Sequence, residues 1–147
     1  MPELRALAAQ LQSLKVYDAF LAKGSFGRND AKELEAANLY TSLAALKPYS
    51  AYGLGIGRDS RGFYTVLAFV HAADASALEN VKLLTAKLGA ESSLVLKKPW
   101  AEVFAIDAAE VRAAGALTWA KLPLRPGVPV SIWTDILFKR DALLLHD

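Results

Sequence analysis

The chain has 147 residues, the usual length of one domain, so we expect a single hydrophobic core. It contains no cysteine and only two histidines, which excludes a disulfide framework, a thiol nucleophile and a zinc centre built from cysteine and histidine. Its 17 basic and 15 acidic residues give a net charge of +2 without a block of either sign, a balance that does not indicate a nucleic-acid partner.

The first 47 residues predict two helices. Apolar residues recur there every three or four positions, which is the spacing of one face of an amphipathic helix. They are Leu4, Leu7, Leu11, Leu14, Tyr17 and Leu21. Gly24 ends this helix, Asp30 and Glu33 form a capping box that begins the next, and Pro48 ends the second one. We therefore expect a helical hairpin over residues 3–47.

A β-hairpin is predicted after it, because three alternate glycines precede a charged turn and a strongly apolar strand over residues 63–71. The glycines are Gly53, Gly55 and Gly57. Successive side chains of a strand point to opposite faces, so these glycines leave one face bare. A loop of four residues, 59–62, places them opposite Ala68, Val66 and Tyr64, in that order. We expect a helix to pack closely against the bare face.

A third helix is predicted over residues 75–88. Ser76 and Glu79 form a capping box before apolar residues at helical spacing, and Gly89 suits a left-handed residue at the helix end. Residues 92–97 then predict a short strand.

Two interpretations compete for residues 103–122. Asp107 and Glu110 could cap a short helix that ends at Gly115, or two strands could be joined at Ala114 and Gly115. We favour the strands, because prolines rather than helical periodicity follow Leu122.

The last segment begins with a rigid loop over residues 123–129. A helical turn near Ile132 and a buried strand over residues 142–145 are expected after it. The elements together predict a single α+β domain over residues 1–147. Its core, residues 50–147, is a mainly antiparallel sheet of about five strands with helices packed on it, preceded by the helical hairpin.

The glycine-rich hairpin is also the best candidate for a ligand site. Backbone amides near Gly57, the charges of Arg58 and Arg61, and His71 could bind an anion or a small molecule. A dinucleotide fingerprint needs its glycines at a turn from strand to helix, whereas these lie in a strand that returns as a strand. A packing role for the glycines and a solvated hairpin tip are therefore favoured.

Other polar residues have simple structural interpretations. His71 precedes Asp74 by three residues, as a base and its orienting carboxylate would, but a hydrogen-bonded histidine at a strand end is favoured. His146, beside the terminus, is expected to be solvated. The acidic residues fit a capping relation or surface ion pairs better than a metal or acid/base site. They are Asp107 with Glu110, Asp135 with Lys139, and Asp141 with Arg140.

Two tryptophans lie close to positive charge, as in a platform that stacks nucleic-acid bases. They are Trp100, which follows Lys97 and Lys98, and Trp133, which precedes Lys139 and Arg140. The chain has no basic stripe, and tryptophans of small domains are usually core or interface residues. Weak nucleic-acid binding is therefore the third functional hypothesis.

The leading hypothesis is a non-catalytic binding or protein-interaction domain that associates with itself. Hydrophobic residues make up 54% of the chain, more than a small soluble monomer needs, and no nucleophile, base or metal set converges in the sequence. Small-molecule or anion binding at the hairpin, with or without catalysis, is the alternative. No cofactor or metal is expected. We expect neither a leader nor a membrane span, which favours the cytoplasm, although a domain excised from an exported protein would look the same.

Overall fold

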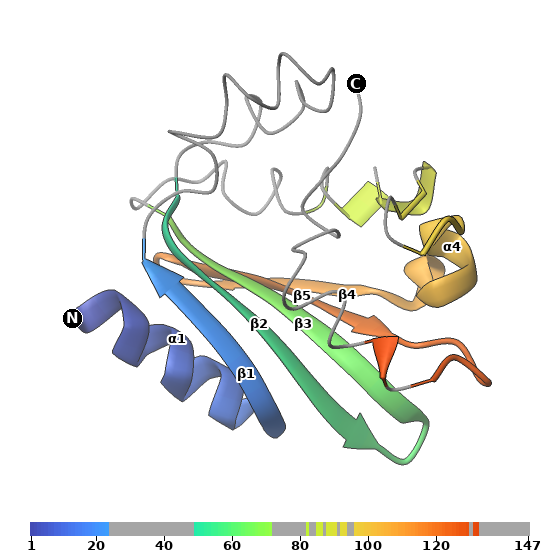
Figure 1. The fold of residues 1–147 in the computed structure, drawn as a ribbon. Coiled ribbons are helices and arrows are strands. Elements are labelled where there is room, and N and C mark those ends of the chain that lie inside the picture. Colours follow the sequence, from blue (N-terminus) through green and yellow to red (C-terminus); the bar gives the residue numbers. More distant parts are fainter. Residues whose placement is uncertain are drawn as a thin grey trace.

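A five-stranded antiparallel sheet forms the centre of the computed structural model (Figure 1). The structure describes residues 1–23, 49–71 and 82–132, with gaps at 83–84, 87, 91, 94–95 and 130. The strands lie in the order β1-β2-β3-β5-β4. Their bounds are β1 Val16–Lys23, β2 Tyr49–Asp59, β3 Gly62–His71, β4 Glu110–Ala114 and β5 Leu117–Pro123. The α+β class is confirmed, and the described residues form a sheet of five strands, as expected.

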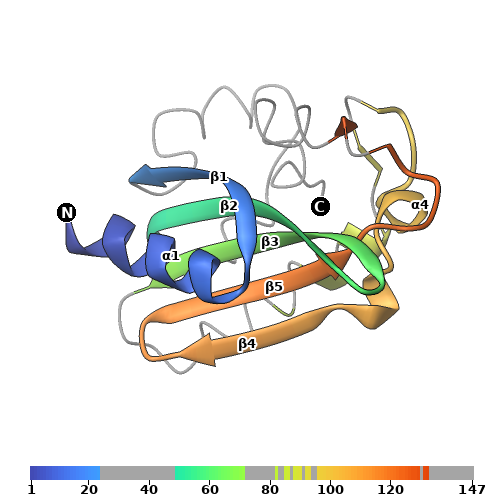
Figure 2. The ribbon, with the colours of Figure 1, turned by 90° about the horizontal axis from the view of Figure 1, so that it is seen from below.

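Helices lie on both faces of this sheet. Helix α1, Pro2–Ser13, lies across β1, β2 and β3 on one face, and Figure 2 shows that it does not extend over β5 and β4. The short helix α4, Trp100–Val103, and the 3-10 turn η2, Ile106–Ala108, precede β4. Helix α4 lies on the other side of the sheet (Figure 1). We call the two surfaces of the sheet the α1 face and the α4 face.

The prediction that one helix continues from Leu4 to Leu21 is wrong. Helix α1 ends at Ser13, Lys15 takes a positive φ of 58°, and residues 16–23 return as strand β1. A residue in the left-handed region ends the helix and reverses the chain. Residues 16–23 then pair with β2, and these long-range hydrogen bonds outweigh the local helical spacing of Tyr17 and Leu21. The second helix of the predicted hairpin, residues 30–47, lies outside the described residues.

The predicted β-hairpin is confirmed, including its register. Gly53, Gly55 and Gly57 lie opposite Ala68, Val66 and Tyr64 in the ladder between β2 and β3. Asp59 pairs with Gly62, so that Ser60 and Arg61 form the turn. Gly62 has a φ of +121°, a conformation that residues with a side chain rarely adopt.

The bare face of the glycines is filled by neighbouring side chains, as expected for packing. A Cβ added to Gly53 would lie 3.2 Å from a Leu11 methyl of α1, and one added to Gly55 would lie 2.6 Å from a Val16 methyl of β1. Leu7 and Leu11 of the helix are buried against this surface. The absence of side chains on β2 therefore lets α1 lie close to the sheet.

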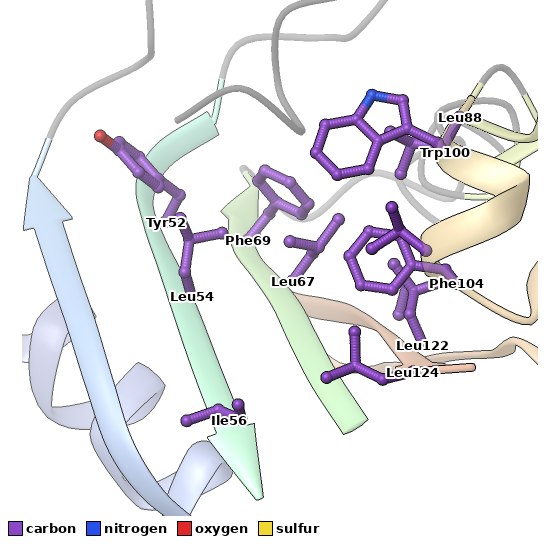
Figure 3. Close-up of a cluster of buried hydrophobic side chains, with 12 residues drawn as sticks. Tyr52, Leu54, Ile56, Leu67, Phe69, Leu88, Trp100, Phe104, Leu122 and Leu124 are labelled. Carbon is purple, nitrogen blue, oxygen red and sulfur yellow. The ribbon is translucent and has the colours of Figure 1, made fainter. Parts of the chain in front are cut away.

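The larger core lies on the α4 face (Figure 3). Large apolar residues of β2 and β3 project from the sheet there, and Trp100 and Phe104 pack over them with a ring separation of 5.5 Å. The buried members are Tyr52, Leu54, Ile56, Leu67, Phe69, Leu88, Trp100, Val103, Phe104, Ala120, Leu122 and Leu124. This face therefore contains most of the aromatic area that the described core buries.

The strand interpretation of residues 103–122 is confirmed, since β4 and β5 meet in a turn in which Gly115 has a φ of +59°. The short strand expected over residues 92–97 is wrong. Ser92 makes only an isolated bridge to Pro99, because the chain folds back within residues 93–98, where the Ser93 amide donates to the Lys98 carbonyl at 2.8 Å.

The third predicted helix is described only in part. Lys82, Thr85, Ala86 and Leu88 are helical, and the helix continues through Gly89 and Ala90, so Gly89 does not end it. The capping box at Ser76 and Glu79 lies outside the described residues. So do the predictions on residues 133–147, including Trp133 and His146, while Ile132 is helical as expected.

Candidate functional site

A polar network surrounds the tip of the β2–β3 hairpin on the α1 face. The Asp59 carboxylate accepts a hydrogen bond from the Arg61 amide at 2.9 Å and one from the Lys121 ammonium at 3.3 Å. The Arg61 guanidinium lies 3.6 Å from Asp59 and 3.8 Å from Glu110. The hydrogen bond from the Arg61 amide holds the pKa of Asp59 below its usual value, with further lowering by Lys121. The network therefore joins β2, β5 and β4.

The predicted ligand residues do not converge within this network. Arg58 lies on the α4 face, where its guanidinium is 5.3 Å from the centre of the Phe63 ring. Arg61 lies in the turn and faces the two carboxylates of the network. Because Arg61 already has acidic neighbours, its charge is largely compensated without an added anion.

The third predicted residue, Gly57, gives no open space to a ligand. A Cβ at this position would lie 2.5 Å from the Tyr64 ring. Strand β2 also lies between β1 and β3, and Gly57 pairs with Val16 on one side and with Tyr64 on the other. In a strand with two neighbours the backbone amides serve the sheet, so they are not available to cradle a phosphate.

His71 lies at the opposite end of the hairpin. Strand β3 is 10 residues long, so at about 3.3 Å per residue His71 is separated from the turn by about 30 Å. Its side chain is only 4% exposed, its backbone amide donates to the Ala116 carbonyl at 2.8 Å, and its ring lies 6.1 Å from that of Phe69. The structure therefore does not bring His71 together with Arg58 or Arg61.

Trp100 is a core residue. Its side chain is 0% exposed and packs with Phe104, so its ring offers no exposed surface on which a base could stack. Its neighbours Lys97 and Lys98 are exposed.

The capping relation expected for Asp107 and Glu110 is wrong, because η2 has no side-chain cap and Glu110 begins β4 beside Arg61.

Tyr64 connects the polar network to α1. Its hydroxyl donates a hydrogen bond to the carbonyl oxygen of Leu14, and the Lys121 ammonium lies 4.1 Å from the centre of its ring. Burial raises the pKa of Tyr64, and the nearby charge of Asp59 raises it further. The sequence predicts that Tyr64 lies opposite Gly57, but it does not predict these polar contacts, because Leu14 and Lys121 are distant in the chain.

The two edges of the sheet differ in character. Edge strand β1 has a register irregularity between Val16 and Asp18, and its Tyr17 and Phe20 side chains are 62% and 37% exposed. Edge strand β4 pairs with β5 in a regular register, and its residues are exposed except for the half-buried Val111. Within the described part of the chain, neither strand has a partner on its outer side.

The patterns that predict β4 as a strand do not show that it lies at an edge. A signal is present in the alternation of opposite charges around a valine, in Glu110, Val111 and Arg112. In a strand this spacing puts the two charges on one face, where they are available to a neighbouring strand.

Among the described residues, no group of three or more histidine, aspartate or glutamate side chains is arranged to hold a metal ion. The helices in the same ranges are all too short or too polar to cross a bilayer. No family model, curated protein sequence or solved structure matches this chain. The functional argument therefore depends on the geometry described above.

Proposed function

We propose that this chain is a non-catalytic protein-interaction domain that associates with itself through an edge of its sheet. The observation that carries the proposal is the regular, exposed edge strand β4. Unpaired backbone amides and carbonyls along such a strand are a template for adding another strand.

The composition of β4 supports this role. Prolines, lysines or bulges in an edge strand keep it from pairing with another chain. Residues 110–114 contain neither proline nor lysine, and the ladder to β5 has no irregularity. Strand β1, by contrast, carries a bulge together with Lys23. Of the two edges, β4 is therefore the better template.

Apolar surface on the same side of the sheet adds to the argument. Leu117 and Trp119 of β5 pack at the border of the apolar cluster that Leu7 and Leu11 form on the α1 face. They remain partly exposed, because α1 extends only over β1, β2 and β3. Partly exposed aromatic residues beside a polar rim are typical of protein interfaces. The mean hydropathy of +0.23 is consistent with an exposed apolar surface that a partner covers.

The test is the molar mass of the purified chain over a concentration series, measured by static light scattering and by sedimentation velocity. We expect the weight-average mass to rise from 15.8 kDa toward twice that value as the concentration increases. A mass that stays at 15.8 kDa up to about 1 mM, where a dissociation constant corresponds to about 4 kcal/mol, would refute self-association.

A further inference from the structure

The charges of β4 are arranged so that the strand is complementary to a copy of itself. Glu110 and Arg112 lie opposite Lys121 and Trp119 of β5, so they share the α1 face, and both are exposed. Val111, between them, packs toward the core of the α4 face. The strand therefore presents one negative and one positive side chain on the same face, two positions apart.

A twofold axis perpendicular to the sheet is the simplest way to join two such edges. It makes the two β4 strands antiparallel and keeps each face of one sheet continuous with the same face of the other. Residues that oppose each other across the new ladder then share a face. In the register centred on Val111, Glu110 of each copy lies opposite Arg112 of the other.

We propose that two copies of this chain pair through β4 in this register, with Val111 beside Val111 and two symmetric Glu110–Arg112 ion pairs. This inference rests on the proposed function and specifies its interface. It gives Arg112 a carboxylate partner, while Glu110 stays within reach of Arg61 of its own chain, 3.8 Å away. The dimer has a continuous sheet with the two β4 strands at its centre.

The neighbouring registers are less favourable. Centring the pair on Arg112 places the two Arg112 side chains opposite each other, and like charges in directly opposed positions destabilise a ladder. Centring it on Ala113 places Arg112 opposite Ala114, which provides no charge partner. The charge pattern therefore selects one register among those that keep the strands paired.

The test uses charge reversal in the full chain. The variant E110R places two arginines opposite each other at both symmetric contacts, and the variant R112E places two glutamates there instead. We expect each single variant to weaken the dimer about tenfold or more, because both contacts become repulsive. The double variant E110R/R112E restores opposite charges, and we expect its dissociation constant to return to that of the unmodified chain.

Mixing the two single variants tests whether the β4 strands of two copies face each other. Strand β4 of E110R carries two arginines, and strand β4 of R112E carries two glutamates.

 In the register centred on Val111, both contacts of the heterodimer join an arginine of one chain to a glutamate of the other. We therefore expect the mixture to associate more tightly than either variant alone. Sedimentation velocity with one variant fluorescently labelled measures this directly. R5E is the matched control: it makes the same charge reversal at an exposed position of α1, which lies over β1, β2 and β3, and we expect it to leave the dissociation constant unchanged.

Two results would overturn the pairing and distinguish it from the proposed function. If the chain dimerises but both single reversals leave the dissociation constant unchanged, the β4 register is wrong while self-association stands. If neither the mixture nor the double variant recovers affinity, the charge pairing is refuted in the same way. A chain that is monomeric at every concentration refutes both. Circular dichroism melting of each variant establishes that any loss of association is not a loss of folding.

Discussion

The hydroxyl of Tyr64 in β3 donates a hydrogen bond to the carbonyl oxygen of Leu14, 50 positions earlier in the chain, at the end of α1. The same ring covers Gly57 of β2, where an added Cβ would lie 2.5 Å away. One side chain therefore ties the end of the helix to two neighbouring strands, at the point where the chain turns through Lys15 into β1.

Replacing Tyr64 with phenylalanine tests this tie. Tyr64→Phe keeps the ring over Gly57 but leaves the partly buried Leu14 carbonyl without its donor, so we expect the free energy of unfolding to fall by about 1 kcal/mol. Chemical denaturation measures the change. Tyr17→Phe is the control, because Tyr17 is 62% exposed, and we expect no measurable effect. Equal stability of Tyr64→Phe and the unmodified chain would contradict the proposed contribution.

The glycine face gives a second prediction with a matched pair. Gly55→Ala places a Cβ 2.6 Å from the stiff, branched side chain of Val16, and we expect it to lower the free energy of unfolding by roughly 1–3 kcal/mol. Gly53→Ala meets the flexible end of Leu21 at 2.9 Å, so its effect is expected to be smaller. Thermal unfolding of both variants checks the order, and a more stable Gly55→Ala would show that the strands do not approach closely there.

The polar network predicts a pH dependence of stability. The pKa of Asp59 is lower in the folded protein than in the unfolded chain, chiefly because its carboxylate accepts the Arg61 amide. The ionised form therefore stabilises the fold above the unfolded pKa of about 3.9, and this contribution is lost as the pH falls through the folded pKa. We expect Asp59→Asn to be less stable than the unmodified chain at neutral pH, and the difference to shrink below about pH 4. A difference that is constant over this range would argue against a role for the charge.

Substitution of Trp100 tests whether this residue belongs to the core or stacks on nucleic-acid bases. Its side chain is fully buried against Phe104, so we expect Trp100→Ala to lower the free energy of unfolding by about 3–5 kcal/mol. Lys98→Ala changes an exposed neighbour and is the control for stability. A single-stranded oligonucleotide that binds the unmodified chain at low salt, and no longer binds a folded Trp100→Phe variant, would contradict the assignment of Trp100 to the core.

Several features of this protein follow from its sequence alone. The alternation of Gly53, Gly55 and Gly57 predicts a strand with one bare face, and the short turn before Gly62 fixes the register with β3, because the side-chain period of a strand is two residues. The glycine and prolines that border residues 117–122 likewise predict β5. These patterns are local, so no knowledge of distant contacts is needed to interpret them.

Only the tertiary structure decided the rest. Residues 16–23 have apolar spacing that also fits a helix, and they form β1 because the glycines of β2 allow Val16 and Leu21 to pack on them. His71 is separated from Arg61 by the length of β3, and Lys121 lies beside Asp59 although the two are 62 positions apart. Which strand becomes an exposed edge depends on the order of strands in the sheet, and that order is set by pairing between distant segments, whose energies no local pattern contains.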